Sequence, residues 1–243
     1  VAHAGIVRRR RPPGIGRSCQ HRNHKWRELP MRHRRLTADD GRMTQRQTND
    51  LITIGRDREA AAAALGAADG VEQLEQVAPL LGAIVGATTK AEALANSLAR
   101  HIDEVHERSL HLASRPRIYF EEWDEPMISG IAWVSELIEA AGGVDVFPQI
   151  AARKNAKDRI VSPDDVIAAR PDVIVGSWCG KKFVAGKVAA RPGFAEVPAV
   201  ATGWLREIKS TLILQPGPAA LTDGLDHMAR IVSEWAERRA TAS

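Results

Sequence analysis

The chain contains few cysteines: Cys19 and Cys179 are the only two among 243 residues. Two cysteines cannot form a disulfide framework, and they exclude a zinc site built from four cysteine thiolates. Long apolar runs are also missing. No uncharged stretch approaches the roughly 18 apolar residues that indicate a transmembrane helix. Residues 1–30 have no apolar run after their basic start, so we expect no secretory signal peptide in this chain.

Positive charge is concentrated at the N-terminus. Residues 1–50 carry 13 Lys and Arg against four acidic residues, whereas the remaining 193 residues carry 21 against 26. The pI near 9.3 is therefore a property of the first fifth of the chain. It is not a sign that the whole protein binds nucleic acid.

Residues 1–50 show no apolar periodicity, and their low hydrophobicity and high net charge predict disorder in isolation. Three interpretations are open. The segment is a basic arm for nucleic acid or acidic lipid, or a solvated tail without function, or not native protein sequence. We favour the last, because a segment rich in Arg, Pro, Gly and His is what a GC-rich gene gives in the wrong reading frame. We expect no nucleic-acid partner.

The next part of the chain predicts helices. Residues 58–65 and Val71–Ala78 are short candidates, and Pro79 is expected to end the second. Lys90–Leu112 gives a firmer prediction of an amphipathic helix of about six turns. Its apolar stripe at i+3/i+4 spacing consists of Ala91, Leu94, Leu98, Ile102, Val105, Ser109 and Leu112.

After Pro116 the pattern alternates between strand and helix. This order predicts an α/β fold with a Rossmann-like, mainly parallel sheet and flanking helices. The expected strands are 117–121, 172–178 and 205–210. The expected helices are 131–141, 183–190, 218–238 and one that begins after the N-cap Ser162 and ends before Pro171. Residues 122–130 are predicted to form a loop.

Three possible chemical motifs are rejected. Gly176–Lys182 has the wrong spacing for a nucleotide-binding phosphate loop. His101, His106 and His111 repeat every five residues, so neighbours lie about 140° apart on a helix and cannot share a metal. Lys181 and Lys182 are expected to lower the pKa of Cys179, but no histidine base is near it in the sequence. We interpret Cys179 as a structural or cleft-lining thiol and expect no enzyme, because the strand-end loops show no nucleophile–base pair and no glycine-rich cofactor loop.

Aromatic and polar residues follow the predicted strands at their carboxyl ends, where open α/β sheets bind ligands. Trp123 lies among acidic residues after the first strand, Trp178 ends the second, and Lys209 follows the third. An aromatic ring in such a place suits stacking on a large planar or apolar ligand. The alternative is that Trp123 and Trp178 cap the sheet and pack against each other. Trp133 and Trp235 lie inside predicted helices and are expected in the core.

From about Gly82 to Ala236 the chain resembles the cobalamin-binding members of the class III periplasmic-binding-protein superfamily. The matching stretches are Arg115–Gly143, Ile160–Phe183 and Glu207–Leu225. These proteins are substrate-binding components of ABC importers for corrinoids, haem and iron–siderophores, with two α/β lobes joined by one long helix. The resemblance implies a remnant of the N-terminal lobe at 51–89, the connecting helix at 90–113 and the C-terminal lobe at 115–239. It also implies a monomer that binds a small molecule without chemistry and meets ABC permease subunits. The implied location is periplasmic or extracytoplasmic.

The resemblance assigns roles to individual residues. Ligand contacts would come from Glu122, Trp123, Trp178 and the segment Lys209–Gln215, with cobalamin as transported ligand rather than cofactor and with no metal ligands. Permease docking would fall to Asp164, with Asp165 as second choice. Haem or an iron–siderophore is the alternative ligand, and an anionic siderophore would favour Lys181, Lys182 and Lys209.

The N-terminal lobe of this family needs well over a hundred residues, whereas only about 89 precede the connecting helix. We therefore expect a frameshift, a misplaced start or a decayed gene upstream. A lobe without its partner presents half a cleft and would lose much of its affinity, so a non-functional truncated lobe is a further alternative.

Overall fold

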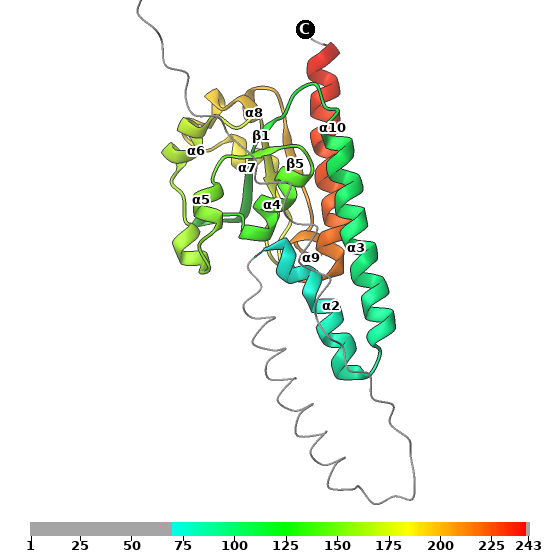
Figure 1. The fold of residues 1–243 in the computed structure, drawn as a ribbon. Helices are drawn as coiled ribbons and strands as arrows, with labels where there is room; N and C mark the ends of the chain where they lie inside the picture. Colours follow the sequence, from blue (N-terminus) through cyan, green and yellow to red (C-terminus); the bar gives the residue numbers. More distant parts are fainter. Residues whose placement is uncertain (1–69, 242–243) are drawn as a thin grey trace, which may run out of the picture. The chain divides into compact units, whose positions relative to one another are not determined.

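The computed structural model describes residues 70–241 (Figure 1). They belong to the second of the chain's two units, Val1–Thr44 and Gln45–Ser243. The predictions for residues 1–50 and for a helix at 58–65 lie outside the described residues. No described helix is long and apolar enough to cross a membrane.

A single sheet forms the centre of this part of the chain. Its strands are β1 (Arg117–Asp124), β2 (Met127–Ser129), β3 (Val144–Asp145), β4 (Val173–Gly176) and β5 (Leu205–Glu207). The order is β2-β1-β4-β5, and β3 also pairs with β1. β1, β3, β4 and β5 run parallel, while β2 is antiparallel to β1. The predicted α/β class and mainly parallel sheet are confirmed.

Helices cover both faces of this sheet (Figure 1). Those after β2 are α4 (Ala132–Ala140), α5 (Pro148–Ala151), α6 (Pro163–Ala169), α7 (Ala185–Ala189), α8 (Pro198–Ala201), α9 (Ser210–Ile213) and α10 (Leu225–Thr241). Single helical turns occur at η2 (Ala156–Arg159), η3 (Phe194–Glu196) and the π-helical η4 (Ala220–Gly224). The predicted terminal helix is therefore two elements, η4 and α10.

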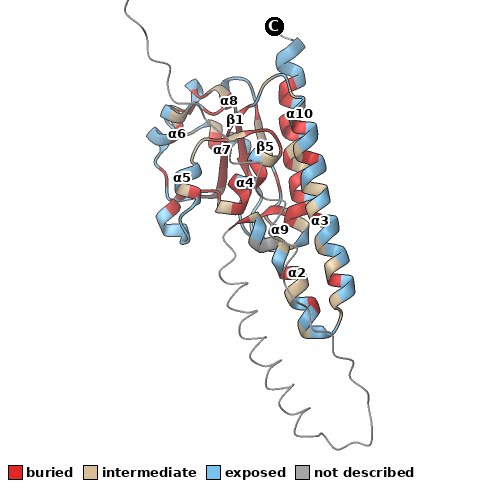
Figure 2. Cartoon of the chain, in the orientation of Figure 1, coloured by how far each residue is buried: buried red, intermediate tan, exposed pale blue. Residues whose placement is uncertain are grey.

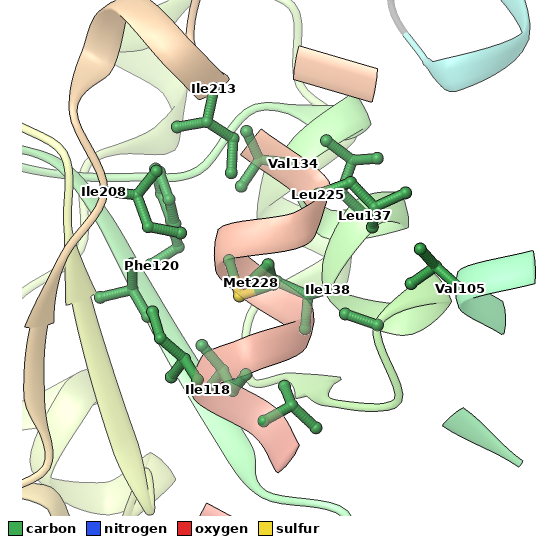
Figure 3. Close-up of a cluster of buried hydrophobic side chains, with 14 of the residues drawn as sticks. Val105, Ile118, Phe120, Val134, Leu137, Ile138, Ile208, Ile213, Leu225 and Met228 are labelled. Atoms are coloured by element: carbon green, nitrogen blue, oxygen red, sulfur yellow. The ribbon is translucent and has the colours of Figure 1, made fainter. Parts of the chain in front are cut away.

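Alternation along β1 divides the core into two clusters. Ile118 and Phe120 face α3, α4 and α10, where they meet Leu137 and Met228 (Figure 3). Tyr119 points to the other face and packs with buried side chains of α6, α7 and α8. Figure 2 shows buried residues gathered on the sheet and on the inner sides of α4 and α10. Trp133 and Trp235 are buried in the first cluster, as predicted.

Two antiparallel helices precede the sheet: α2 (Val71–Val85) and α3 (Thr88–Ser109). The prediction that α2 ends at Pro79 is wrong, because a proline removes only one N–H bond and the helix continues to Gly86, which caps it with φ 73°. α3 confirms the long predicted helix. Leu94 of its expected apolar stripe is 42% exposed, whereas Ala91 and Leu98 on either side of it in the stripe are buried.

The predicted loop at 122–130 is wrong. β1 extends to Asp124 and forms a hairpin with β2, with Trp123 opposite Ile128 and a bulge between Glu121 and Trp123. Acidic residues have low strand propensity, so the sequence pattern ended the strand too early. The bulge re-aims the residues that follow it, which places Trp123 at the edge described next.

Candidate ligand-binding edge

The candidate site lies at the carboxyl ends of three neighbouring parallel strands, β1, β4 and β5. Because β1 pairs with β4 and β4 pairs with β5, the residues that follow these strands come to one edge of the sheet. Trp123 and Asp124 come from the end of β1, Cys179 and Lys181 follow β4, and Lys209 follows β5. This is the edge at which the sequence predicted a ligand.

Trp123 is half-buried and is held by its surroundings. Its Nε1 donates to the carbonyl oxygen of Glu125 at 2.8 Å. The Nζ of Lys181 lies 4.0 Å from the Trp123 ring centroid, within range of a cation–π contact, and also donates to Asp124 Oδ1. Asp124 therefore holds the Lys181 ammonium against Trp123, the one aromatic ring that this edge presents among the described residues.

Trp178 occupies a different environment. It is 3% exposed, its Nε1 donates to Glu121 Oε1 at 2.9 Å, and its ring packs edge-on against Phe183 with centroids 5.0 Å apart. The structure thus places Trp178 inside the second core cluster, beneath the edge. Gly176 makes this packing possible, since a Cβ there would lie 1.9 Å from the Phe183 ring.

A buried ion pair lies beneath the edge and was missed by the sequence analysis. Glu121 is fully buried and accepts hydrogen bonds from Arg191 Nη1 at 2.6 Å and Arg191 Nη2 at 2.9 Å. The Tyr119 hydroxyl donates to Glu121 Oε2 at 3.1 Å. With the Trp178 indole, all four contacts satisfy the carboxylate, as a buried charge requires. No local signal could have found this pair, because 70 residues separate its members.

Tyr119 is the only tyrosine of the chain, which makes its ionisation observable. Burial of the hydroxyl, and secondarily the Glu121 charge, raise its pKa well above the usual value. We expect absorbance at 295 nm to show no phenolate in the folded protein near pH 10, whereas the chain in urea titrates at about 10. Above about pH 10 the unfolded chain loses the Tyr119 proton while the folded protein keeps it. Ionisation then favours the unfolded state, so stability should fall as pH rises above about 10. A normal titration of folded protein would contradict the buried hydroxyl.

Glu122 also has a defined partner. Arg159, which is buried, donates through Nη1 to Glu122 Oε2 at 2.5 Å and to the Ser129 carbonyl oxygen at 2.5 Å. This pair ties the hairpin to η2. The structure therefore shows Glu122 in an ion pair that stabilises the hairpin beside Trp123.

The prediction for the Cys179 thiol is wrong in sign. Its pKa is raised, first by partial burial and then by the Glu122 charge, while a hydrogen bond with Ser210 works in the opposite direction. Lys181 is paired with Asp124 and directed at the Trp123 ring, so it does not favour the thiolate. Cys179 is exposed and remains a neutral thiol at the edge.

The other predicted site residues lie on the surface. Lys209 is exposed and directly precedes α9, and Gln215 is exposed just after α9. Asp164 and Asp165 are both exposed in the first turn of α6. Residues 70–241 contain no group of three His, Cys, Asp or Glu side chains arranged to hold a metal ion.

Solved structures resemble this fold. A haem-binding periplasmic protein, RhuT from Roseiflexus sp. RS-1, matches with a TM-score of 0.59 and 20% identity over 69% of this chain and 65% of its own. A possible iron-binding solute-binding protein from Staphylococcus epidermidis matches with 0.59 and 15% identity over 68% and 63%. The vitamin B12-binding protein BtuF of Vibrio cholerae matches with 0.50 and 17% identity over 67% and 62%. At these identities the likeness establishes the fold alone.

The chain spans less than two thirds of the length of these solved proteins. No curated protein sequence matches it significantly. The family model described as "Periplasmic binding protein" matches residues 45–212, which include α2, α3 and the whole sheet. The chain belongs to the periplasmic binding protein family.

Proposed function

We propose that the chain binds cobalamin or a related corrinoid, without chemistry, as part of a substrate-binding component of an ABC importer. The observation that carries this proposal is the half-buried Trp123 ring at the carboxyl edge of the sheet. The ring lies at the end of β1, where its Nε1 donates to Glu125 and Lys181 lies over its face. A flat aromatic anchor at such an edge can stack on the face of a macrocycle. The same fold occurs in a vitamin B12-binding protein, so it is compatible with this ligand.

The residues at this edge suit binding rather than catalysis. The histidines of residues 70–241 lie in or directly after α3 and in α10, away from the strand ends. The Cys179 thiol is neutral, and the carboxylates Glu121, Glu122 and Asp124 each accept from a cation. No described nucleophile at the edge has a free base beside it, which supports a role without covalent steps.

Haem or an iron–siderophore is the second candidate ligand. It is favoured by the exposed ammonium groups of Lys182 and Lys209 near the same edge, and by the haem-binding proteins among the structural relatives. Equilibrium dialysis of the full chain against cyanocobalamin, haemin and a ferric hydroxamate siderophore separates the candidates. We expect the chain to retain cyanocobalamin. In competition, we expect the siderophore to displace it less readily than haemin does. Preferential retention of haemin or siderophore would transfer the role to the second candidate.

We infer further that Asp164, rather than Asp165, would meet the permease. Asp165 accepts from Ser162 N at 2.8 Å and from Ser162 Oγ at 2.7 Å, in a capping box that lowers its pKa. The Asp164 carboxylate is exposed and makes no hydrogen bond or ion pair within the described range 70–241. An unengaged carboxylate at a helix start is free to pair with an arginine of a partner.

The two aspartates should separate in experiment. Ser162→Ala removes the hydroxyl that caps α6 and is expected to lower the free energy of unfolding by about 0.5–2 kcal/mol. Asp164→Asn should leave stability within about 0.5 kcal/mol while it weakens association with the permease. Urea denaturation and a pull-down with the permease check both results. Full permease association of Asp164→Asn would count against the docking role, and an unchanged stability of Ser162→Ala would count against the cap.

A further inference from the structure

The surface beside Trp123 continues across the hairpin as an apolar row. Trp123 pairs with Ile128 across β1 and β2, and Ile128 forms an antiparallel bridge with Ile160. Residues directly opposite each other on antiparallel strands place their side chains on the same face, so these three share one face of the hairpin. Met127 lies on the opposite face and is buried in the core. Trp123 and Ile128 are half-buried, and Ile160 is 46% exposed.

Lys181 closes one end of this row. Its Nζ lies 4.0 Å from the Trp123 ring centroid and 5.2 Å from that of Trp178, and it donates to Asp124, whose side chain is mostly buried. An ammonium has three N–H donors, and the Lys181 side chain is 37% exposed. Because Asp124 accepts from only one of these donors, the others can donate to a group from outside the protein.

A ring that stacks on this face of Trp123 must displace the ammonium from the indole. A neutral ligand would remove the cation–π contact and return at most a weaker hydrogen bond from Lys181 to a neutral acceptor. A ligand with a carboxylate or phosphate at its rim would instead give the displaced ammonium a charge-assisted bond while Asp124 stays paired. The edge thus favours rings that carry an anionic group over rings that do not.

We propose that Lys181 and Ile160 determine the specificity of this edge for a flat ring with an anionic group at its rim. The ring lies along the row of Trp123, Ile128 and Ile160, and the anionic group binds Lys181. This inference rests on the proposed function and adds the residues that would select its ligand. A corrinoid phosphodiester and haem carboxylates share the required chemistry, and Lys181 and Ile160 become specificity-determining residues.

Binding of matched ligands tests the role of Lys181 in the full chain. Cyanocobalamin carries a phosphodiester, dicyanocobinamide lacks it, and haemin carries two carboxylates. Lys181→Met is expected to weaken the anionic ligand that binds, cyanocobalamin or haemin, by about three- to tenfold and to leave dicyanocobinamide equal or slightly tighter. The control Lys187→Met removes an exposed ammonium of α7 and should change no affinity. Equal losses for cyanocobalamin and dicyanocobinamide, or equal effects of both variants, would overturn the inference.

The row has its own test. Ile160→Ser should weaken all ring ligands by about three- to tenfold, dicyanocobinamide included, because it removes apolar contact and no charge. Leu110→Ser, at a leucine after α3 that is 61% exposed, is the control and should have no effect. Unchanged affinity of Ile160→Ser would remove Ile160 from the site.

Fluorescence quenching without ligand tests the contact between Lys181 and Trp123 separately from the proposed function. If Lys181 covers Trp123, acrylamide should quench Trp123 fluorescence more strongly in Lys181→Met than in the wild type, with Trp123→Phe backgrounds subtracted from each. If no ring ligand binds the wild type, the proposed function fails and the ligand class fails with it. If rings bind but show no preference that depends on Lys181, only this inference fails.

Discussion

Replacing Arg191 by Met is expected to lower the free energy of unfolding by about 3–5 kcal/mol. The reason is that Glu121 is fully buried, and Arg191 supplies two of its four hydrogen bonds and its only described countercharge. Without Arg191 the carboxylate keeps only the neutral donors of Tyr119 and Trp178. It must then remain charged at high cost or take up a proton.

Urea denaturation measures this effect, and two further variants give it meaning. Arg230→Met breaks an exposed pair with Glu234 at 4.0 Å and should cost less than about 1 kcal/mol. The double variant Arg191→Met/Glu121→Gln should recover part of the loss, since it removes the uncompensated charge and keeps an amide oxygen that can accept from Tyr119 or Trp178. A loss below about 1 kcal/mol for Arg191→Met alone would show that the pair is not buried as described.

Replacing Trp123 by Ala is expected to weaken corrinoid binding by about 1–3 kcal/mol, or roughly five- to 150-fold. Trp123 is the aromatic anchor of the proposed site, and its removal also frees Lys181 to turn toward Asp124 alone. The change should appear in the dissociation constant for cyanocobalamin, measured by calorimetry of the full chain.

Trp123→Phe separates the ring from its hydrogen bond. It keeps an aromatic face but loses the Nε1 donor to Glu125, so its affinity should lie between those of the wild type and Trp123→Ala. Circular dichroism should show both variants folded, because Trp123 is half-buried and lies outside both core clusters. Equal affinity of wild type and Trp123→Ala would refute the assigned role.

Sequence patterns predicted the features that depend on local signals. Apolar runs and turn residues placed β1, β4 and β5, and the strand–helix alternation gave a mainly parallel sheet. Ser162 and Pro163 marked the start of α6, which the structure bears out with a full capping box. Because the order of parallel strands fixes where their carboxyl ends meet, Trp123 and Lys209 could be assigned to one edge without a structure.

Features that depend on tertiary contacts could not be predicted in this way. The sequence indicated Trp178 as a ligand contact beside Trp123, but its burial follows from contacts with Glu121 and Phe183, which only the folded sheet brings to it. The predicted direction of the Cys179 pKa shift was wrong because Lys181 is near the thiol in sequence, whereas the Lys181 side chain contacts Asp124 and Trp123 instead. Burial and orientation decided both cases.

The most direct test of the central claim follows the six tryptophan indoles by NMR while cyanocobalamin is added to the full chain. Trp123→Phe identifies the Trp123 signal, and the buried Trp133 and Trp235 serve as internal references. We expect a saturable shift of the Trp123 indole at ligand concentrations below about 1 mM, with the two references nearly unchanged. A folded chain whose Trp123 signal does not respond, or responds no more than Trp133 and Trp235, would contradict a corrinoid site at this edge.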